Sequence, residues 1–137
     1  MNSTARLLPT LAVAAALALG ACGDDSSTGP SDPPEEYNVS VQGQEFVVRV
    51  ATQAQIDAME ARLASGEEGV INGRLLASDG QFNVGWSWHM DPNSVEVVDM
   101  AIELCDGTPR MVEADLNYWL DTVGRFCPWS ATVTGRR

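Results

Sequence analysis

Alternation of hydrophobic and polar side chains predicts a series of β-strands along the chain. In the segment 45–52, Phe46, Val48 and Val50 fall on one face, as expected for a strand with one buried face. The turn Gln42-Gly43-Gln44 precedes it and has the composition of a three-residue hairpin loop. The predicted strands cover residues 37–41, 45–52, 70–77, 86–90, 95–98 and 126–134, with a bulge indicated at Gly73.

A different spacing, with hydrophobic residues three or four positions apart, predicts a first helix over 53–65. Thr52 and Gln55 match the capping-box pattern at its start, and Gly66 closes it. The apolar stripe of this helix consists of Ile56, Met59 and Leu63.

The same spacing returns near the C-terminus and predicts a second helix over 109–123. Thr108 is a favourable cap, Pro109 suits the first helical position, and Gly124 ends the segment. One face carries a continuous apolar stripe, which is typical of a helix that packs on a core. The stripe consists of Val112, Leu116, Trp119, Leu120 and Val123.

The order of these elements indicates an α+β fold. We predict that the two helices pack on a small antiparallel or mixed sheet with an extra N-terminal strand, and a ferredoxin-like arrangement is one candidate. Residues 37–137 are expected to form a single globular domain, because their number is sufficient for one hydrophobic core. The last residues, 135–137, are expected to fray.

The N-terminus has the pattern of an export signal. Arg6 precedes an apolar run from Leu7 to Leu19, which is too short to span a bilayer. The run ends in Leu19-Gly20-Ala21-Cys22, which resembles the lipobox of bacterial lipoproteins. The resemblance implies a signal peptide over 1–21 and a lipid on Cys22, which becomes the mature N-terminus. The alternative is an ordinary secreted protein in which Cys22 remains a thiol.

Residues 22–36 are predicted to form a lipidated, acidic and flexible tether. Its fourteen residues from 23 to 36 contain no apolar side chain apart from prolines, and such a chain has a reach of about 20 Å. Without the signal, seven arginines oppose nineteen acids, a formal charge of −12; five of these acids lie in the tether, which leaves −7 for 37–137. Because this charge repels phosphates, no nucleic acid is expected as a partner.

Cys105 and Cys127 remain once Cys22 is lipidated. An even pair in an exported domain favours a disulfide, which would stabilise the fold by roughly 3 kcal/mol in the chain-entropy description. The alternative is a catalytic thiol at Cys127, which would need a free sulfur and a nearby base.

The stretch 86–92 contains two of the four tryptophans and the only histidine. As a strand it would place the tryptophans and Met90 on one side and Ser87 and His89 on the other. Ser87 and His89 would then have Cα atoms about 6.5 Å apart and parallel side chains, which disfavours a nucleophile and base. The acids that follow match no zinc or calcium spacing. We therefore predict no catalytic residue, no metal site and no cofactor.

The tryptophans admit two interpretations. They can be core residues with Met90 between them, and Trp119 and Trp129 would then complete an aromatic cluster near the disulfide. Alternatively, one or two of them remain exposed and anchor a ligand or a protein partner. The candidate binding residues are Trp86, Trp88, His89, Asp91, Asp106 and Trp129.

A set of motifs in a fixed order occupies much of 45–134. They are Phe82-Asn83-Val84-Gly85-Trp86-Ser87-Trp88-His89-Met90-Asp91-Pro92, Ala101-Ile102-Glu103-Leu104-Cys105-Asp106, Val112-Glu113 and Cys127-Pro128-Trp129-Ser130. Together they resemble a small domain that is found alone in exported bacterial proteins and at the N-terminus of a eukaryotic calmodulin-binding protein of the BP seventy-four type. The family usually has Phe at position 88 and Leu at position 90. The resemblance implies a domain identity and no catalytic residues.

The expected function is that of a cell-envelope lipoprotein with a non-catalytic binding domain. It would be anchored to the membrane through Cys22, face the extracytoplasmic side and bind a protein of the envelope. Calmodulin is not expected as a partner, because the second helix is acidic and lacks the basic face of calmodulin targets. The alternatives are an inhibitor of an exported peptidase and a small enzyme that uses His89 with Asp91 or Asp106 as acid and base.

Overall fold

The computed structural model describes residues 34–137, so the predicted signal peptide, Cys22 and most of the predicted tether lie outside the described residues. The strands are β1 (Glu35–Val41), β2 (Gln44–Val50), β3 (Val70–Ala77), β4 (Trp88–Met90), β5 (Glu96–Val98), β6 (Arg125–Phe126) and β7 (Ala131–Arg136). The helices are α1 (Gln53–Ser65), α2 (Pro109–Ala114) and α3 (Leu116–Tyr118), with short helical turns η1 (Pro92–Ser94), η2 (Glu103–Cys105) and η3 (Trp119–Val123). The structure confirms an α+β fold with an N-terminal strand.

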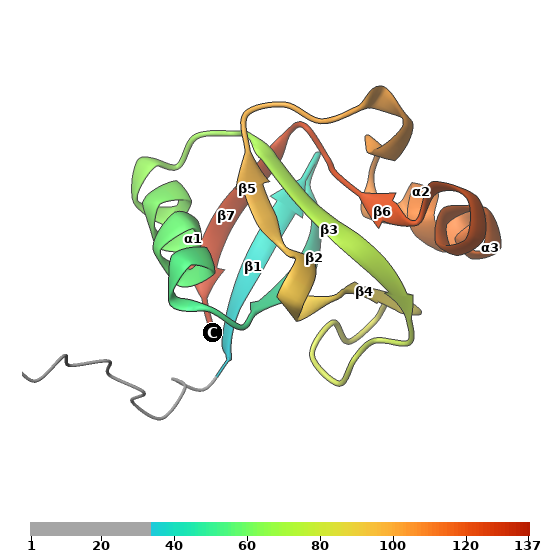
Figure 1. The fold of residues 1–137 in the computed structure, drawn as a ribbon, viewed down its shortest axis with the longest axis horizontal. Coiled ribbons are helices and arrows are strands. Elements are labelled where there is room, and N and C mark those ends of the chain that lie inside the picture. The colour runs from blue at the N-terminus through green and yellow to red at the C-terminus, as the bar shows by residue number, and fades with distance from the viewer. Residues whose placement is uncertain (1–33) are drawn as a thin grey trace, which may run out of the picture.

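The strands divide between two antiparallel sheets. The first has the order β2-β1-β7, and the second is built on β3, which pairs with β4, β5 and β6. In Figure 1, β3 crosses β1 and β2, with α1 at one side of the strands and α2 and α3 at the other. Gly69, just before β3, exchanges two backbone hydrogen bonds with Ala131 of β7 and links the sheets. This division differs from the single sheet of the ferredoxin-like candidate.

The hydrophobic core lies between the sheets. Alternate residues of β1 and β2 are buried, as the period of a strand requires. The centre is aromatic, because the Trp88 ring lies 5.6 Å from Phe46 and 5.4 Å from Phe126, whose ring also contacts Trp119 at 5.8 Å. The predicted aromatic core is therefore confirmed for Trp88 and Trp119, and Trp129 lies outside it.

The first hairpin and first helix follow from local chemistry. Val41 pairs with Gln44, so the turn has two residues rather than the predicted three. Gln42 and Gly43 both have positive φ, 50° and 78°, as this tight hairpin requires. Helix α1 has the predicted bounds because Thr52 caps it and Gly66 ends it in the left-handed conformation.

Gly73 in the middle of β3 is required by packing. A Cβ atom at this position would lie 2.8 Å from the sulfur of Met90 and 2.9 Å from its Cγ. Gly73 pairs with Phe126 of β6. Because it has no side chain, the Met90 side chain can pack directly against the backbone of β3 at this position. Close packing, rather than the predicted bulge, explains this glycine.

The predicted second helix is interrupted. Asp115 leaves the helical conformation, with φ −137° and ψ 55°, and separates α2 from α3, which continues as the π-helical turn η3. Asp115 and Asn117 have low helix propensity, which favours a break at this point. Val112 and Trp119 of the predicted stripe are nevertheless buried.

The C-terminal strand also differs from the prediction. Residues 126–134 contain the end of β6, a turn and most of β7, and the two strands belong to different sheets. The expected fraying of 135–137 is wrong for Gly135 and Arg136, which pair with β1. Arg136 also forms an ion pair of 2.6 Å with Glu35, so the C-terminal strand is fixed to the N-terminal one.

Candidate functional site

The predicted strand 86–90 is shorter in the structure, and its residues have different environments. Trp86 precedes β4, is half-buried and donates its indole N–H to the carbonyl of Glu45 at 3.0 Å. Trp88 is fully buried in the core, and its indole N–H has no hydrogen-bond partner among the described residues. Trp88 is thus a core residue, whereas Trp86 reaches the surface.

His89 is held by a structural hydrogen bond. Its Nδ1 lies 2.7 Å from the carbonyl oxygen of Ser78, which can only accept, so Nδ1 carries the proton. The ring packs edge-on against Phe82 at 5.3 Å, and a Cβ at Gly80 would lie 2.8 Å from its Cγ. The hydroxyl of Ser87 instead donates to Glu113 at 2.7 Å, so these two residues do not form a nucleophile and base.

Asp91 is also engaged in structure. One carboxylate oxygen pairs with Arg74, and the other accepts the backbone N–H of Asn93 at 3.0 Å, which caps η1. The hydrogen bond from Arg74 is the main reason why the pKa of Asp91 is lowered, although burial acts in the opposite direction. Within residues 34–137, neither Asp91 nor Asp106 forms a hydrogen bond with His89.

Asp106 orients the turn that carries Trp129. Its Oδ1 accepts the backbone N–H groups of Gly107 and Trp129, both at 2.9 Å. Beside it, Cys105 and Cys127 form the predicted disulfide, with Cα atoms 5.1 Å apart, and Cys127 N–H donates to the Cys105 carbonyl at 2.8 Å. The alternative of a catalytic thiol at Cys127 is wrong, because its sulfur is bonded to Cys105.

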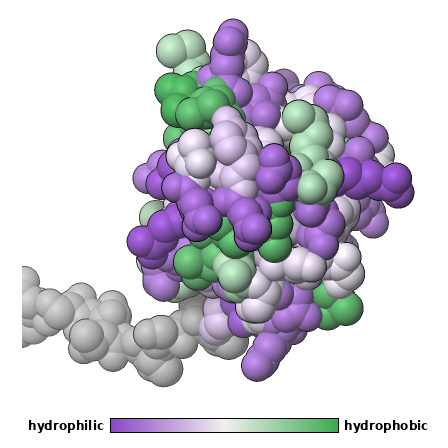
Figure 2. All heavy atoms as spheres, turned by 90° about the vertical axis from the view of Figure 1, so that its right-hand side faces the viewer, coloured by the Kyte–Doolittle hydropathy of each residue, from purple (hydrophilic) through white to green (hydrophobic). Residues whose placement is uncertain are grey.

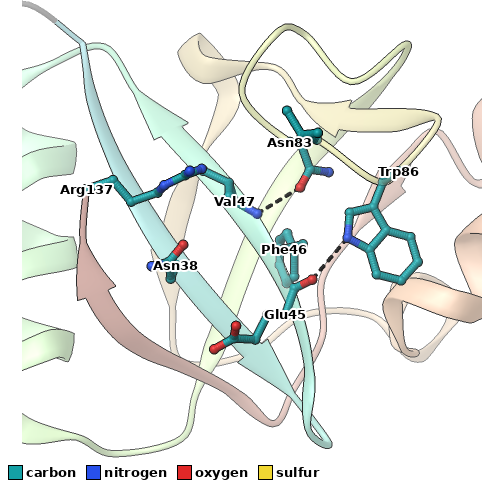
Figure 3. Close-up of a pocket in the computed structure, with 8 residues that line it drawn as sticks. Asn38, Glu45, Phe46, Val47, Asn83, Trp86 and Arg137 are labelled. Carbon is teal, nitrogen blue, oxygen red and sulfur yellow. Dashed lines mark hydrogen bonds between the residues drawn. The ribbon is translucent and has the colours of Figure 1, made fainter.

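One surface pocket lies beside Trp86. It has a volume of about 310 Å³ and is shown in Figure 3, where the Arg137 side chain extends towards Asn83 and Val47. Asn83 is fully buried and connects two elements, since it accepts the N–H of Val47 and donates to the Trp88 carbonyl, both at 2.8 Å. Its polar groups are therefore satisfied by the protein itself.

A larger and more hydrophobic groove lies beside Trp129. It has a volume of about 570 Å³ and is lined by Glu68, Gly69, Val70, Asp99, Met100, Ala101 and Trp129. The loop that follows β5 passes over the top of the molecule in Figure 1, and Figure 2 shows hydrophobic side chains gathered at the top of the adjoining face.

Four exposed hydrophobic residues make up what we call the Trp129 surface: Met100 and Trp129 line the groove, whereas Ile102 and Leu104 lie beside the disulfide. The exposed fractions are 85% for Met100, 67% for Ile102, 53% for Leu104 and 42% for Trp129. Trp129 and its neighbour Asp106 were predicted from the sequence, but the other three residues were not. Their signal was present as a mixed hydrophobic run after residue 98, in which strand and helix propensities compete.

The predicted binding residues therefore do not converge on one site. Trp88, His89 and Asp91 are buried, Trp86 lines the pocket of Figure 3, and Asp106 supports Trp129 at the larger groove. Within residues 34–137, no group of three histidine, cysteine or carboxylate side chains is placed to hold a metal ion. No helix in the described part of the chain is long and apolar enough to cross a bilayer.

The comparisons with known proteins agree with the motifs. Comparison with curated proteins and with solved structures found no match. Residues 35–136 match the family model described as the BP seventy-four N-terminal domain, and this match spans every strand and helix of the described residues. The chain therefore belongs to the BP seventy-four N-terminal domain family.

Proposed function

We propose that this protein is an exported lipoprotein, anchored in the cell envelope through Cys22, whose folded domain is a non-catalytic binding module. The observation that carries the binding role is the Trp129 surface, whereas the anchor rests on the lipobox-like sequence before Cys22. Single exposed hydrophobic residues are common on proteins, but several on two segments that a disulfide joins beside a groove are typical of an interaction site. The tryptophan in particular offers much contact area at small entropic cost.

The disulfide and Asp106 hold the Trp129 surface in place, which favours binding. The disulfide joins the loop of Met100, Ile102 and Leu104 to the turn of Trp129, and Asp106 fixes the backbone of that turn. A surface that is ordered before its partner arrives loses less entropy on association. By contrast, the enzyme alternative needs His89 with Asp91 or Asp106. The Nδ1 of His89 is bonded to Ser78, Asp91 is paired with Arg74, and Asp106 accepts the Trp129 N–H.

A capture experiment with envelope extract tests the proposal. The purified domain is immobilised as wild type, as the double variant Ile102→Ala/Trp129→Ala, and as Val84→Ala, an exposed apolar residue beside the pocket of Figure 3. We expect the wild type and Val84→Ala to retain the same envelope protein and the double variant to lose it. Equal capture by all three, or no specific capture by the wild type, would contradict a binding role for the Trp129 surface.

The pocket beside Trp86 is lined by the polar residues Asn38, Glu45 and Arg137. However, the indole N–H of Trp86 and the side-chain amide of Asn83 already form hydrogen bonds within the domain. We therefore assign the binding role to the Trp129 surface rather than to this pocket. Inhibition of an exported peptidase would be one form of such binding, and residual activity of purified exported peptidases with added domain measures it.

A further inference from the structure

Acidic side chains lie in and next to the segments that carry the Trp129 surface, and we call this set the acidic rim. It consists of Glu67, Glu68, Asp99, Glu103 and Asp106, all with exposed side chains. Glu68 and Asp99 line the groove itself, and Glu103 lies between Ile102 and Leu104 on the loop. Within residues 34–137, none of these five carboxylates forms an ion pair. The rim thus adds an unneutralised negative field to a hydrophobic surface.

A cation, Arg62, lies at the edge of this rim. It donates to the backbone carbonyl of Glu68 at 3.3 Å, and its guanidinium lies over Gly69, where a Cβ atom would collide with Nη1. Arg62 is therefore directed at the backbone rather than at a carboxylate. Five acids against this arginine leave the rim strongly negative.

The charge selects among possible occupants of the surface. The chain's own segment 23–34, which precedes β1, contains three acids and no basic residue, so the rim repels it. A second copy is disfavoured by the formal charge of −7 on residues 37–137. Anionic lipid headgroups are repelled for the same reason. A partner with positive charge beside apolar side chains matches both properties of the surface.

We propose that the Trp129 surface binds a cationic amphipathic segment of a peptide or protein, an inference that rests on the proposed binding function. The apolar face of the segment contacts Met100, Ile102, Leu104 and Trp129, and its lysine or arginine side chains lie near Glu68, Asp99 and Glu103. The unbranched Met100 adapts its shape to different apolar residues. Charge selects the partner, whereas the apolar contacts supply most of the affinity.

Binding of designed peptides to the folded domain tests this inference. The probe is a labelled amphipathic helical peptide of about 20 residues with leucines on one face and lysines on the other. A matched peptide has glutamates in place of the lysines. Fluorescence anisotropy compares both peptides on wild-type domain, on Ile102→Ala/Trp129→Ala, on Asp99→Asn/Glu103→Gln and on the control Glu45→Gln/Asp121→Asn. Asp106 is left unchanged because it holds the Trp129 backbone.

The expected results separate the two contributions. The apolar double variant should weaken the lysine peptide about tenfold or more, and the charge variant should weaken it about threefold to tenfold, less so in high salt. The control should change the affinity by less than about twofold, because its exposed carboxylates lie on other elements. The glutamate peptide should bind the wild type more weakly than the lysine peptide.

Different failures have different meanings. Equal binding of the two peptides would overturn the charge selection proposed here but leave a hydrophobic binding surface, and hence the proposed function, intact. Failure of both peptides to bind, combined with specific capture of an envelope protein through Trp129, would likewise overturn only this inference. Failure of both experiments would overturn the inference and the proposed function together.

Discussion

Trp88 and His89 are neighbours on β4, and both are buried for structural reasons. Trp88 fills the aromatic centre of the core, whereas His89 joins the loop after β3 to β4 through the Ser78 carbonyl. The residue types that first drew attention to this stretch are therefore used for packing and for one internal hydrogen bond. The surface tryptophans, Trp86 and Trp129, are the ones available to a partner.

Trp88 has a buried N–H without a partner in the described residues, which predicts an unequal response to two substitutions. Trp88→Phe removes the indole N–H and keeps an aromatic ring. The family resemblance implies that Phe is the usual residue at this position. We expect it to change the free energy of unfolding by less than about 1.5 kcal/mol. Trp88→Ala leaves a cavity and should cost about 3–5 kcal/mol. Urea unfolding measures both, and a larger loss for Phe would indicate that an N–H partner exists.

For His89, the structure predicts a loss of stability rather than of activity. His89→Ala removes the hydrogen bond to Ser78 and the contact with Phe82, at a cost of about 2–4 kcal/mol. The adjacent, exposed Ser87→Ala is the control and should cost less than about 1 kcal/mol. Thermal unfolding of both variants checks this. An unchanged melting temperature for His89→Ala would return the enzyme alternative to consideration.

Asp91 predicts a dependence of stability on pH. Because Arg74 lowers the pKa of Asp91 in the folded state, the contribution of the ionised group is present above its unfolded pKa, near 4, and is lost as the pH falls through the folded value. Asp91→Asn keeps the cap of η1 but removes the charge. It should cost about 1–2 kcal/mol at pH 7, since Arg74 is largely exposed. The difference from the wild type should shrink below about pH 4, as urea unfolding at several pH values would show.

At the scale of elements, the sequence predicts the features that neighbouring residues determine, such as the ends of a helix. Helix α1 was predicted with its exact bounds because Thr52, Gln55 and Gly66 act within a few residues of it. The break at Asp115 was missed because the apolar stripe continues across it. The separation of β6 from β7, and of the strands into two sheets, depends on pairings between distant segments such as β1 with β7 and Gly69 with Ala131. A single sequence contains no periodic signal for such pairings.

The candidate site could be predicted only in part for the same reason. Trp129 and Asp106 were identified because residue type alone marks an aromatic anchor and a carboxylate. Met100, Ile102 and Leu104 become visible as surface residues only when the chain leaves the sheet after Val98 and the disulfide holds the loop against the Trp129 turn. His89 and Asp91 were included by type, but their partners are distant in sequence: Arg74 lies within β3 and Ser78 directly follows it.

The disulfide is expected to stabilise both the fold and the Trp129 surface. The Cys105→Ala/Cys127→Ala variant should lose roughly 3 kcal/mol of unfolding free energy, because the bond closes a loop with a sequence separation of 22 residues. Urea unfolding measures this loss. If the bond also orders the surface, the variant should bind the lysine peptide less tightly under conditions in which it is still folded. Equal affinity would indicate that Asp106 and the core are sufficient to fix the surface.

For the whole molecule, the negative charge and the predicted lipid act in different ways. The acids repel anionic headgroups, so electrostatic attraction would not hold the protein at a membrane. In the proposed function, membrane association comes from a lipid on Cys22, and the predicted tether gives the Trp129 surface a reach of about 20 Å. The proposal thus assigns anchoring to the N-terminus and recognition to the domain, without overlap.

This separation makes a prediction for Cys22→Ala. Several acyl chains at about 0.8 kcal/mol per buried methylene give stable anchoring, and within residues 34–137 no helix is long and apolar enough to cross a bilayer. The variant should move from the membrane fraction to the soluble fraction and should not incorporate labelled palmitate, yet bind the lysine peptide with wild-type affinity. Cys105→Ala/Cys127→Ala, which also removes cysteines, is the control and should stay with the membrane. Continued membrane retention of Cys22→Ala would show that another feature holds the protein at the membrane. The proposed anchoring through Cys22 would then be wrong, whereas the proposed binding role of the Trp129 surface would be unaffected.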